Sequence, residues 1–271
     1  MVRHGQTTPV AVHNKNVGRP AVRLILRLAL LLVTYVCCPA MLDAQYAMGV
    51  SGLLTVPSAE MQPQGRFMAG ANYLPDVMTP RQWAYNTGNY FFNITFLPFL
   101  EVAYRCTLFK QNASGRNGRS RWQQDRSVSL RLRLLKESRY LPAIVAGSND
   151  VFTTNQLNPV EDVSSNRYFS SVFAVATKRW HIGGHVVEFT LGGLVPMRKQ
   201  AIQEGLFAGV GYTFPFRMPL SLLVEYDTNQ VNAGMKARLF NHCSVHVLAC
   251  GFKSLSGGIR YEFDLFNAYR P

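Results

Sequence analysis

Apolar and polar residues alternate with a period of two along most of the chain after residue 45. From 127 to 134, every even-numbered residue is Val or Leu and every odd-numbered residue is Ser or Arg. A period of two predicts β-strands with one apolar and one polar face. The alternation predicts twelve strands, at residues 66–74, 88–96, 99–109, 126–136, 141–148, 168–178, 182–193, 205–214, 218–227, 231–240, 243–252 and 256–264.

The predicted strands are long, and their connections alternate in length. Strands of ~9–11 residues suit a tilted membrane span, whereas strands of soluble proteins average ~5–6 residues. Long connections at 75–87, 110–125, 149–167 and 194–204 alternate with short turns. Outer-membrane barrels have this asymmetry, with the short turns in the periplasm. The predicted fold class is therefore all-β, a transmembrane antiparallel β-barrel of about 12 strands, with 10 or 14 as alternatives.

Aromatic residues near the strand ends favour this barrel over a soluble β-sandwich, which would share the alternation. They suit the girdles that flank the apolar band of a membrane barrel. They are Tyr73, Tyr90, Phe96, Tyr168, Trp180, Tyr212, Phe214, Tyr226, Tyr261 and Phe263. The last strand reads Ser256-x-Gly258-x-x-Tyr261-x-Phe263, which resembles the signal that barrel-assembly machinery recognises on a closing strand.

The N-terminal region has the features of a secretory signal peptide. Basic residues precede an eleven-residue apolar run, Leu28–Cys38, which is too short to span a membrane as a helix. A small-residue cleavage site follows at Leu42-Asp43-Ala44. The predicted organisation is a signal peptide at 1–44, a periplasmic or lumen-entering segment at 45–65 and a β-barrel at 66–271. An uncleaved N-terminal membrane anchor is the alternative.

Composition narrows the class of protein further. The chain has 271 residues, a net charge of +13, a mean hydropathy near zero and 16% charged residues. The low share of charged residues argues against a disordered chain. The chain has a single long apolar run, which excludes a polytopic helical membrane protein. Residues 1–44 hold five Lys/Arg and one Asp, so the exported chain would carry +9. It would keep Cys106, Cys243 and Cys250, which allow at most one disulfide.

The polar faces of the strands supply a candidate network of charges inside the lumen. Basic and acidic members are nearly balanced, which argues for paired charges across a narrow interior rather than an ion-selective pore. The alternative is a path for a polysaccharide or small solute. The candidate residues are Arg66, Glu101, Arg105, Arg131, Arg133, Glu188, Glu225, Asp227, Lys236, Arg238, Arg260, Glu262 and Asp264.

A second candidate site is a basic surface loop at 110–125. If it is extracellular, it faces lipid phosphates or acidic glycans, and Trp122 could stack on a sugar ring. A solvated loop without a ligand is the alternative. The residues are Lys110, Arg116, Arg119, Arg121, Trp122 and Arg126.

The residues do not favour an enzyme. His181 and His185, like His242 and His246, are four apart, which on a strand separates each pair by ~13 Å and suits no helical metal site. Ser244 and His246 share a face of one strand, but no acidic residue is placed to orient the histidine. We expect no catalytic residue, metal or cofactor, and no nucleic-acid partner; a barrel-borne hydrolase is the weakest alternative.

One stretch resembles a known family. Gly52, Leu53 and Leu54 are followed by Pro57-Ser58-Ala59 and then Gly65, and this looks like the opening motif of the YjbH family. Further matches follow in order over roughly residues 46–180, at Pro98, Glu101, Arg105, Thr107, Gly147, Asp150 and Val175–Lys178. The resemblance implies an outer-membrane β-barrel linked to exopolysaccharide production. The chain would be a short single-domain member, since larger members carry a second region.

These features together predict a function. We expect an outer-membrane β-barrel that assists the production or export of surface polysaccharide, and a scaffold or anchor without transport is the alternative. A charge-bridged, closed lumen would favour the scaffold, and an open path would favour export. The expected partners are outer-membrane lipid, barrel-assembly machinery during biogenesis, and acidic polysaccharide or periplasmic export proteins.

Overall fold

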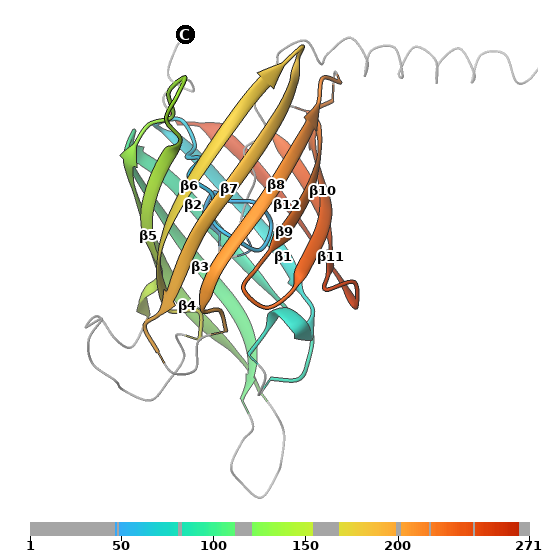
Figure 1. Cartoon of the computed structure of the whole chain (residues 1–271). Coiled ribbons are helices and arrows are strands. Elements are labelled where there is room, and N and C mark those ends of the chain that lie inside the picture. The colour runs from blue at the N-terminus through green and yellow to red at the C-terminus, as the bar shows by residue number, and fades with distance from the viewer. Residues whose placement is uncertain are drawn as a thin grey trace, which may run out of the picture. The chain divides into compact units, whose positions relative to one another are not determined.

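Twelve antiparallel strands form a closed barrel in the computed structural model of the chain (Figure 1). The structure describes residues 47, 49–80, 83–111, 121–153, 168–198, 202–216, 218–240 and 242–265. The predicted signal peptide, residues 1–44, lies outside them. The elements are β1 (Arg66–Leu74), η1 (Asp76–Met78), β2 (Thr87–Leu97), β3 (Leu100–Gln111), β4 (Arg121–Leu135), β5 (Ala143–Thr153), β6 (Ser171–Ile182), β7 (His185–Pro196), β8 (Gly205–Phe214), β9 (Leu220–Tyr226), β10 (Val231–Leu239), β11 (Cys243–Cys250) and β12 (Ser254–Asp264).

The barrel closes because the first and last strands pair. Each strand bonds to its neighbours in chain order, and β1 pairs with β12 from Arg66 opposite Asp264 to Tyr73 opposite Gly257. Closure leaves no strand edge with unpaired backbone groups. The predicted all-β barrel of twelve strands is therefore confirmed.

The two ends of the barrel differ in their connections. One end, here the short-turn end, holds the turns after β2, β4, β6, β8 and β10, together with the start of β1 and the end of β12. In Figure 1 this end points upward, where the β6–β7 hairpin protrudes. The opposite, long-loop end holds η1 and the connections that follow the odd-numbered strands.

Several predicted connections are wrong in their bounds. β5 runs to Thr153, five residues into the connection predicted at 149–167. Residues 110–125 were expected to form a loop, but β3 runs to Gln111 and β4 begins at Arg121, with Trp122 opposite Lys110 in the ladder. The β6–β7 turn was expected at Trp180-His181, but both residues belong to β6. The turn is Gly183-Gly184, whose φ angles are +56° and +88°. A two-residue hairpin turn of this kind needs positive φ at both positions, which glycine adopts without strain.

The alternation in the sequence separates the inside of the wall from the outside. In β4, Ser127, Ser129 and Arg131 are buried, whereas Leu132 and Leu134 are exposed. The outer wall is accordingly rich in exposed Leu, Val, Ile and aromatic side chains. No helix in the described part of the chain has the length and apolar character needed to cross a membrane.

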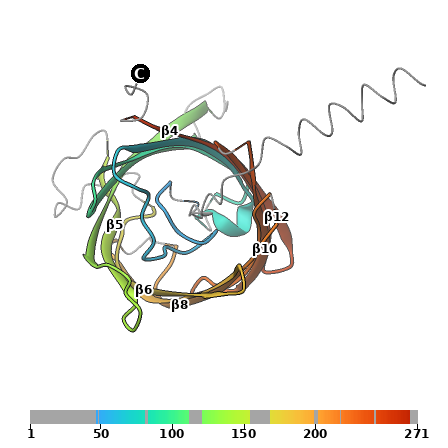
Figure 2. The ribbon, with the colours of Figure 1, turned by 90° about the horizontal axis from the view of Figure 1, so that it is seen from above.

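A segment that precedes β1 lies inside the barrel. Seen along the barrel axis, the chain before β1 runs within the ring of strands (Figure 2). Every residue from Gly49 to Ala59 is buried. We call residues 49–62 the inner segment. It occupies the lumen, which is one of the two places predicted for residues 45–65.

Candidate functional site: the occupied lumen and its two mouths

The inner segment turns back on itself within the barrel. The Leu53 amide donates to the Val56 carbonyl at 2.9 Å, and the Ala47 amide donates to the Leu54 carbonyl at the same distance. Gly52 and Pro57 form an isolated antiparallel bridge. These bonds satisfy only some of the backbone groups of this buried turn. Since buried backbone groups need partners, the barrel wall has to supply the rest.

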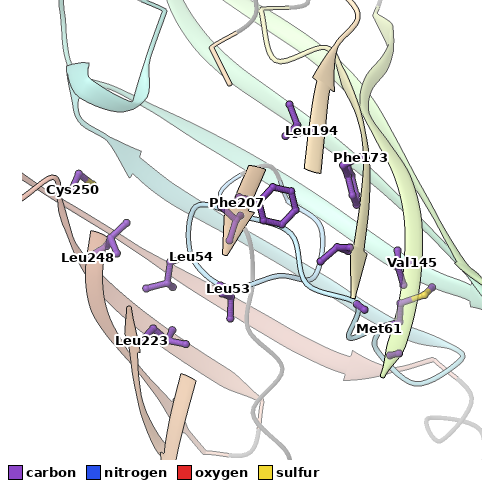
Figure 3. Packing of buried hydrophobic residues seen from close by; sticks show 14 residues of the cluster. Leu53, Leu54, Met61, Val145, Phe173, Leu194, Phe207, Leu223, Leu248 and Cys250 are labelled. Carbon is purple, nitrogen blue, oxygen red and sulfur yellow. The ribbon is translucent and has the colours of Figure 1, made fainter. Parts of the chain in front are cut away.

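An apolar cluster joins the inner segment to the wall strands β5–β9 and β11 (Figure 3). It contains Leu53, Leu54, Val56, Ala59 and Met61 of the segment, and Ala143, Val145, Phe173, Val175, Leu194, Phe207, Leu223, Leu248 and Cys250 of the wall. Wall glycines make the close approach possible. A Cβ at Gly209 would lie 2.1 Å from Leu53 Cδ1, and one at Gly234 would lie 2.7 Å from Leu54 Cδ1.

Two buried glutamates of the wall bind the backbone of the inner segment. Glu101 accepts hydrogen bonds from the Ser51 amide at 2.8 Å and the Ser51 hydroxyl at 2.9 Å. Glu225 accepts from the amides of Leu54 and Thr55 at 3.0 and 2.7 Å, and from the Thr55 hydroxyl at 2.6 Å. The two side chains together accept five hydrogen bonds from Ser51, Leu54 and Thr55. The carboxylates therefore anchor the turn of the segment.

Arg131 connects one of these anchors to the far part of the segment. Its guanidinium lies 3.1 Å from Glu101 and donates to the carbonyls of Ser58 and Glu60. Both side chains of the ion pair are fully buried. The Ala59 amide donates to the Thr177 hydroxyl at 2.8 Å. The segment is thus bound to several separate strands of the wall.

The predicted lumen charges divide into groups. Glu101, Arg131 and Glu225 bind the inner segment, as described above. Glu262 is paired with Arg238 at 2.7 Å and with Arg260 at 2.8 Å, and all three side chains are buried. Arg66 pairs with Asp264 at 3.0 Å at the short-turn end. The charges of β10, β12 and β1 therefore form their own network in the wall.

The remaining predicted charges lie in other surroundings. Arg105 is buried and its guanidinium lies 4.2 Å from the centre of the Phe169 ring. Asp227 accepts from Asn232 at 2.8 Å, next to the Thr55 hydroxyl. Lys236 is buried, and Glu188 and Arg133 are half-buried.

An aromatic cap lies at the long-loop end. Trp83 stacks with Tyr85 and Phe109 at 5.8 Å between ring centres, and meets Tyr168 and Phe169 edge to face. The Tyr85 hydroxyl accepts from the Lys110 amide at 2.6 Å, and burial raises the pKa of Tyr85. Together with Ala47, Val50, Leu74 and Ala103, the cap forms a second apolar cluster.

The residues of the predicted basic loop border this cap as strand residues. Lys110, Arg121, Trp122 and Arg126 belong to β3 and β4, and Lys110 lies 5.0 Å from the ring centre of Trp122. The aromatic side chain predicted to stack on a sugar is therefore in contact with a cation of its own chain. Arg116 and Arg119 lie outside the described residues.

The short-turn end is hollowed, in contrast to the capped end. A cleft of about 840 Å³ opens between the end of the inner segment, the β4–β5 turn and the β6–β7 hairpin. Its ion pairs join Arg179 to Glu60 at 2.8 Å, and both Lys178 and Arg179 to Glu137 at 3.1 and 3.4 Å. Partial burial tends to raise the pKa of Glu137, but hydrogen bonds from the Arg179 amide and Lys178, with their positive charges, lower it overall.

Sequence reasoning missed several residues of this architecture because it considered mainly charged side chains. Neutral residues of the wall bind the segment as well: Asn89 donates to the Ala47 carbonyl and Asn93 to the Gly49 carbonyl. Asn72, Asn89 and Asn93 all lie on inner faces, and this recurrence was an available signal. Two cleft residues were missed: Lys136 is the last residue of the predicted strand 126–136, and Arg139 falls in the short turn predicted after it. Cys106, Cys243 and Cys250 are free, and the described part of the chain holds no group of side chains suited to a metal.

Comparison with known proteins gives one family. A family model described as YjbH, Exopolysaccharide biosynthesis protein YbjH, matches residues 44–201. A search of the curated proteins finds no match. The matched region contains the inner segment and the wall as far as β7. Several residues that carried the resemblance lie where these two parts meet: Gly52–Ala59 is in the lumen, Glu101 is bonded to Ser51 and Thr177 is bonded to Ala59.

Proposed function

From the membership of this chain in the YjbH exopolysaccharide biosynthesis family, we propose that it is an outer-membrane β-barrel that serves exopolysaccharide production as a closed platform. In this proposal the barrel anchors a polysaccharide or its export machinery at the periplasmic face, and no polymer passes through the lumen. The family and the fold support a role in exopolysaccharide production. The closed-platform role goes beyond them.

The observation that carries the proposal is the occupied lumen. The inner segment is bonded to Glu101 of β3 and to Glu225 of β9, which are far apart in the chain. An apolar cluster packs beside the segment. Passage of a polymer would require these contacts to break together. Each buried donor or acceptor left without a partner costs ~1–3 kcal/mol. A static support has no such requirement.

The outer wall supports a membrane location. Large apolar side chains cover it along its height, including Leu191, Leu206 and Ile259, which are more than half exposed. An exposed apolar surface of this extent suits lipid rather than water. With an exported chain, the short-turn end would face the periplasm, as in other outer-membrane barrels.

Gated export is the second candidate, because the short-turn end is open up to the inner segment. In that case the segment would move aside during transport. The two functions differ in whether the segment has to move.

A disulfide lock separates them. The Ala59 amide and the Thr177 hydroxyl are 2.8 Å apart, so Ala59→Cys with Thr177→Cys would tie the inner segment to β6. Thr177→Cys with Thr190→Cys is the matched control, because these hydroxyls are 2.9 Å apart and the cross-link would join β6 to β7 within the wall. Both pairs would be introduced after Cys106, Cys243 and Cys250 are replaced by alanine.

Surface and released polysaccharide would be measured in a deletion strain restored with each variant. The platform predicts that deletion lowers polysaccharide and that both cross-linked variants restore it. If the control restores polysaccharide and the Ala59–Thr177 lock does so only after a reductant is added, gated export would replace the platform. An unchanged polysaccharide profile in the deletion strain would remove both functions.

A further inference from the structure

The cleft at the short-turn end has an excess of positive charge that the rest of the lumen lacks. Five basic residues line it, Arg133, Lys136, Arg139, Lys178 and Arg179, against two acidic ones, Glu60 and Glu137. Deeper in the barrel, Arg131 is paired with Glu101, and Arg238 and Arg260 are paired with Glu262. We propose that this cleft binds an acidic polysaccharide chain, which deepens the proposed function and rests on it.

The two acidic residues do not neutralise the cleft. Glu60 and Glu137 are both engaged by Arg179, and Glu137 is also engaged by Lys178. These four side chains balance one another. The lining keeps a surplus of positive charge because it has three more basic than acidic residues, and Lys136 and Arg139 among them are exposed. A cleft with one sign of charge concentrates ligands of the opposite sign.

A buried side chain in the same cleft lacks hydrogen-bond partners. Gln62 lines the cleft and is 1% exposed, yet neither its amide nitrogen nor its amide oxygen has a partner among the described residues. Buried polar groups are nearly always bonded, so an unpartnered carboxamide points to a ligand or water. Its donor and acceptor are the pair needed to bind a sugar hydroxyl. This observation is independent of the charges.

The size and position of the cleft fit a few sugar residues. Its volume of about 840 Å³ lies within the range of ~300–1,000 Å³ for ligand sites. Gln62, Pro63 and Gln64, which lead from the inner segment to β1, are part of its lining. A polysaccharide chain that enters the cleft would therefore meet the basic residues of its rim, Lys136 and Arg139 among them, before it reaches the closed lumen. The rim would attract carboxylates, and Gln62 would bind hydroxyls.

Binding to a defined probe tests this site. The purified full chain in detergent micelles would be titrated with fluorescently labelled oligogalacturonate, an acidic oligosaccharide, and with neutral maltohexaose. We expect saturable binding of the acidic probe only, weakened by added salt because exposed charges are screened. Lys136→Ala with Arg139→Ala should lower the affinity roughly tenfold, since two exposed attractions are lost.

Further variants separate a specific site from general positive charge. Gln62→Leu should lower affinity without changing its salt dependence, whereas Glu137→Gln should raise affinity by removing a negative charge. The control is Lys253→Ala, which removes an exposed basic residue at the long-loop end. It should leave binding within about twofold of the unchanged chain.

The inference would be overturned if the acidic probe does not bind, or if the control weakens binding as much as the cleft variant. Capture at the cleft of an acidic periplasmic protein, without binding of the probe, would replace the glycan with a protein partner. Loss of polysaccharide on deletion together with no probe binding would leave the proposed function standing. If the probe binds but the deletion strain makes as much polysaccharide as before, the proposed function would be rejected and the glycan site in the cleft would stand.

Discussion

One carboxylate oxygen of Glu225, Oε1, accepts two hydrogen bonds from Thr55 of the inner segment. The Thr55 amide donates at 2.7 Å and the Thr55 hydroxyl at 2.6 Å. The second oxygen accepts from the Leu54 amide at 3.0 Å. Asn232 also donates to the Thr55 hydroxyl, at 3.1 Å. The deepest turn of the segment is thus held by one carboxylate, and several consequences can be measured.

Replacing Glu225 with alanine should loosen the inner segment. The change leaves two buried amides and a hydroxyl without their acceptor, and each such group costs ~1–3 kcal/mol. We expect faster hydrogen exchange over residues 50–57 and a lower urea midpoint in detergent micelles. Glu204→Ala is the control, because Glu204 is exposed. Unchanged exchange in the Glu225 variant would mean that the apolar cluster alone retains the segment.

Adding a methyl group at Gly209 should destabilise the same contact by crowding. The new Cβ would lie 2.1 Å from Leu53 Cδ1, so Leu53 must move, and such overpacking typically costs ~1–3 kcal/mol. Gly193→Ala is the matched control on the neighbouring strand, where the nearest atom, Leu206 Cδ2, is at an ordinary 3.6 Å. Urea unfolding of the two variants should differ by this amount. Equal midpoints would contradict the close packing of segment and wall.

Breaking the buried pair of Arg131 and Glu101 should cost more than removing both charges. Arg131→Met leaves the Glu101 carboxylate buried without its cation, at a cost of ~3–5 kcal/mol. Adding Glu101→Gln should recover part of this loss, because no uncompensated charge remains. The free energy of unfolding in micelles checks both variants, with Arg121→Met as an exposed control. A double variant less stable than Arg131→Met alone would show that Glu101 matters mainly through Ser51 and Asn93, which also donate to it.

Much of the wall could be predicted because the outer face of the strands is apolar, whereas the inner face of strands such as β4 carries polar residues. The bounds of β1 and β8 agree with the predicted ranges 66–74 and 205–214. Where alternation fails, prediction fails too. The start of β4, Arg121-Trp122-Gln123-Gln124, does not alternate between polar and apolar residues, and its pairing with β3 shows that it is a strand. The pair Gly183-Gly184 is a turn signal that can be read in the sequence, and it lies just beyond the predicted turn at Trp180-His181.

The contacts of the inner segment could not be predicted in the same way. Glu225 and Thr55 are 170 residues apart in the chain, and a carboxylate that accepts from a backbone amide requires no particular residue type at the other position. The charged residues on inner faces were identifiable from alternation. Their partners depend on strand tilt and on the path of the segment, which a period of two does not specify.

The membrane location can be tested through the depth dependence of a charge on the outer wall. Leu191 lies in the middle of β7 and Leu206 near the start of β8 at the long-loop end, and both are exposed, at 62% and 72%. In a bilayer, an arginine at the midplane of a barrel costs ~2–4 kcal/mol, but only ~0–1 near the interface. Leu191→Arg should therefore reduce the folded, heat-modifiable fraction in lipid vesicles far more than Leu206→Arg. Alanine at each position controls for the loss of the leucine, and equal effects of the two arginines would argue that this wall does not face lipid.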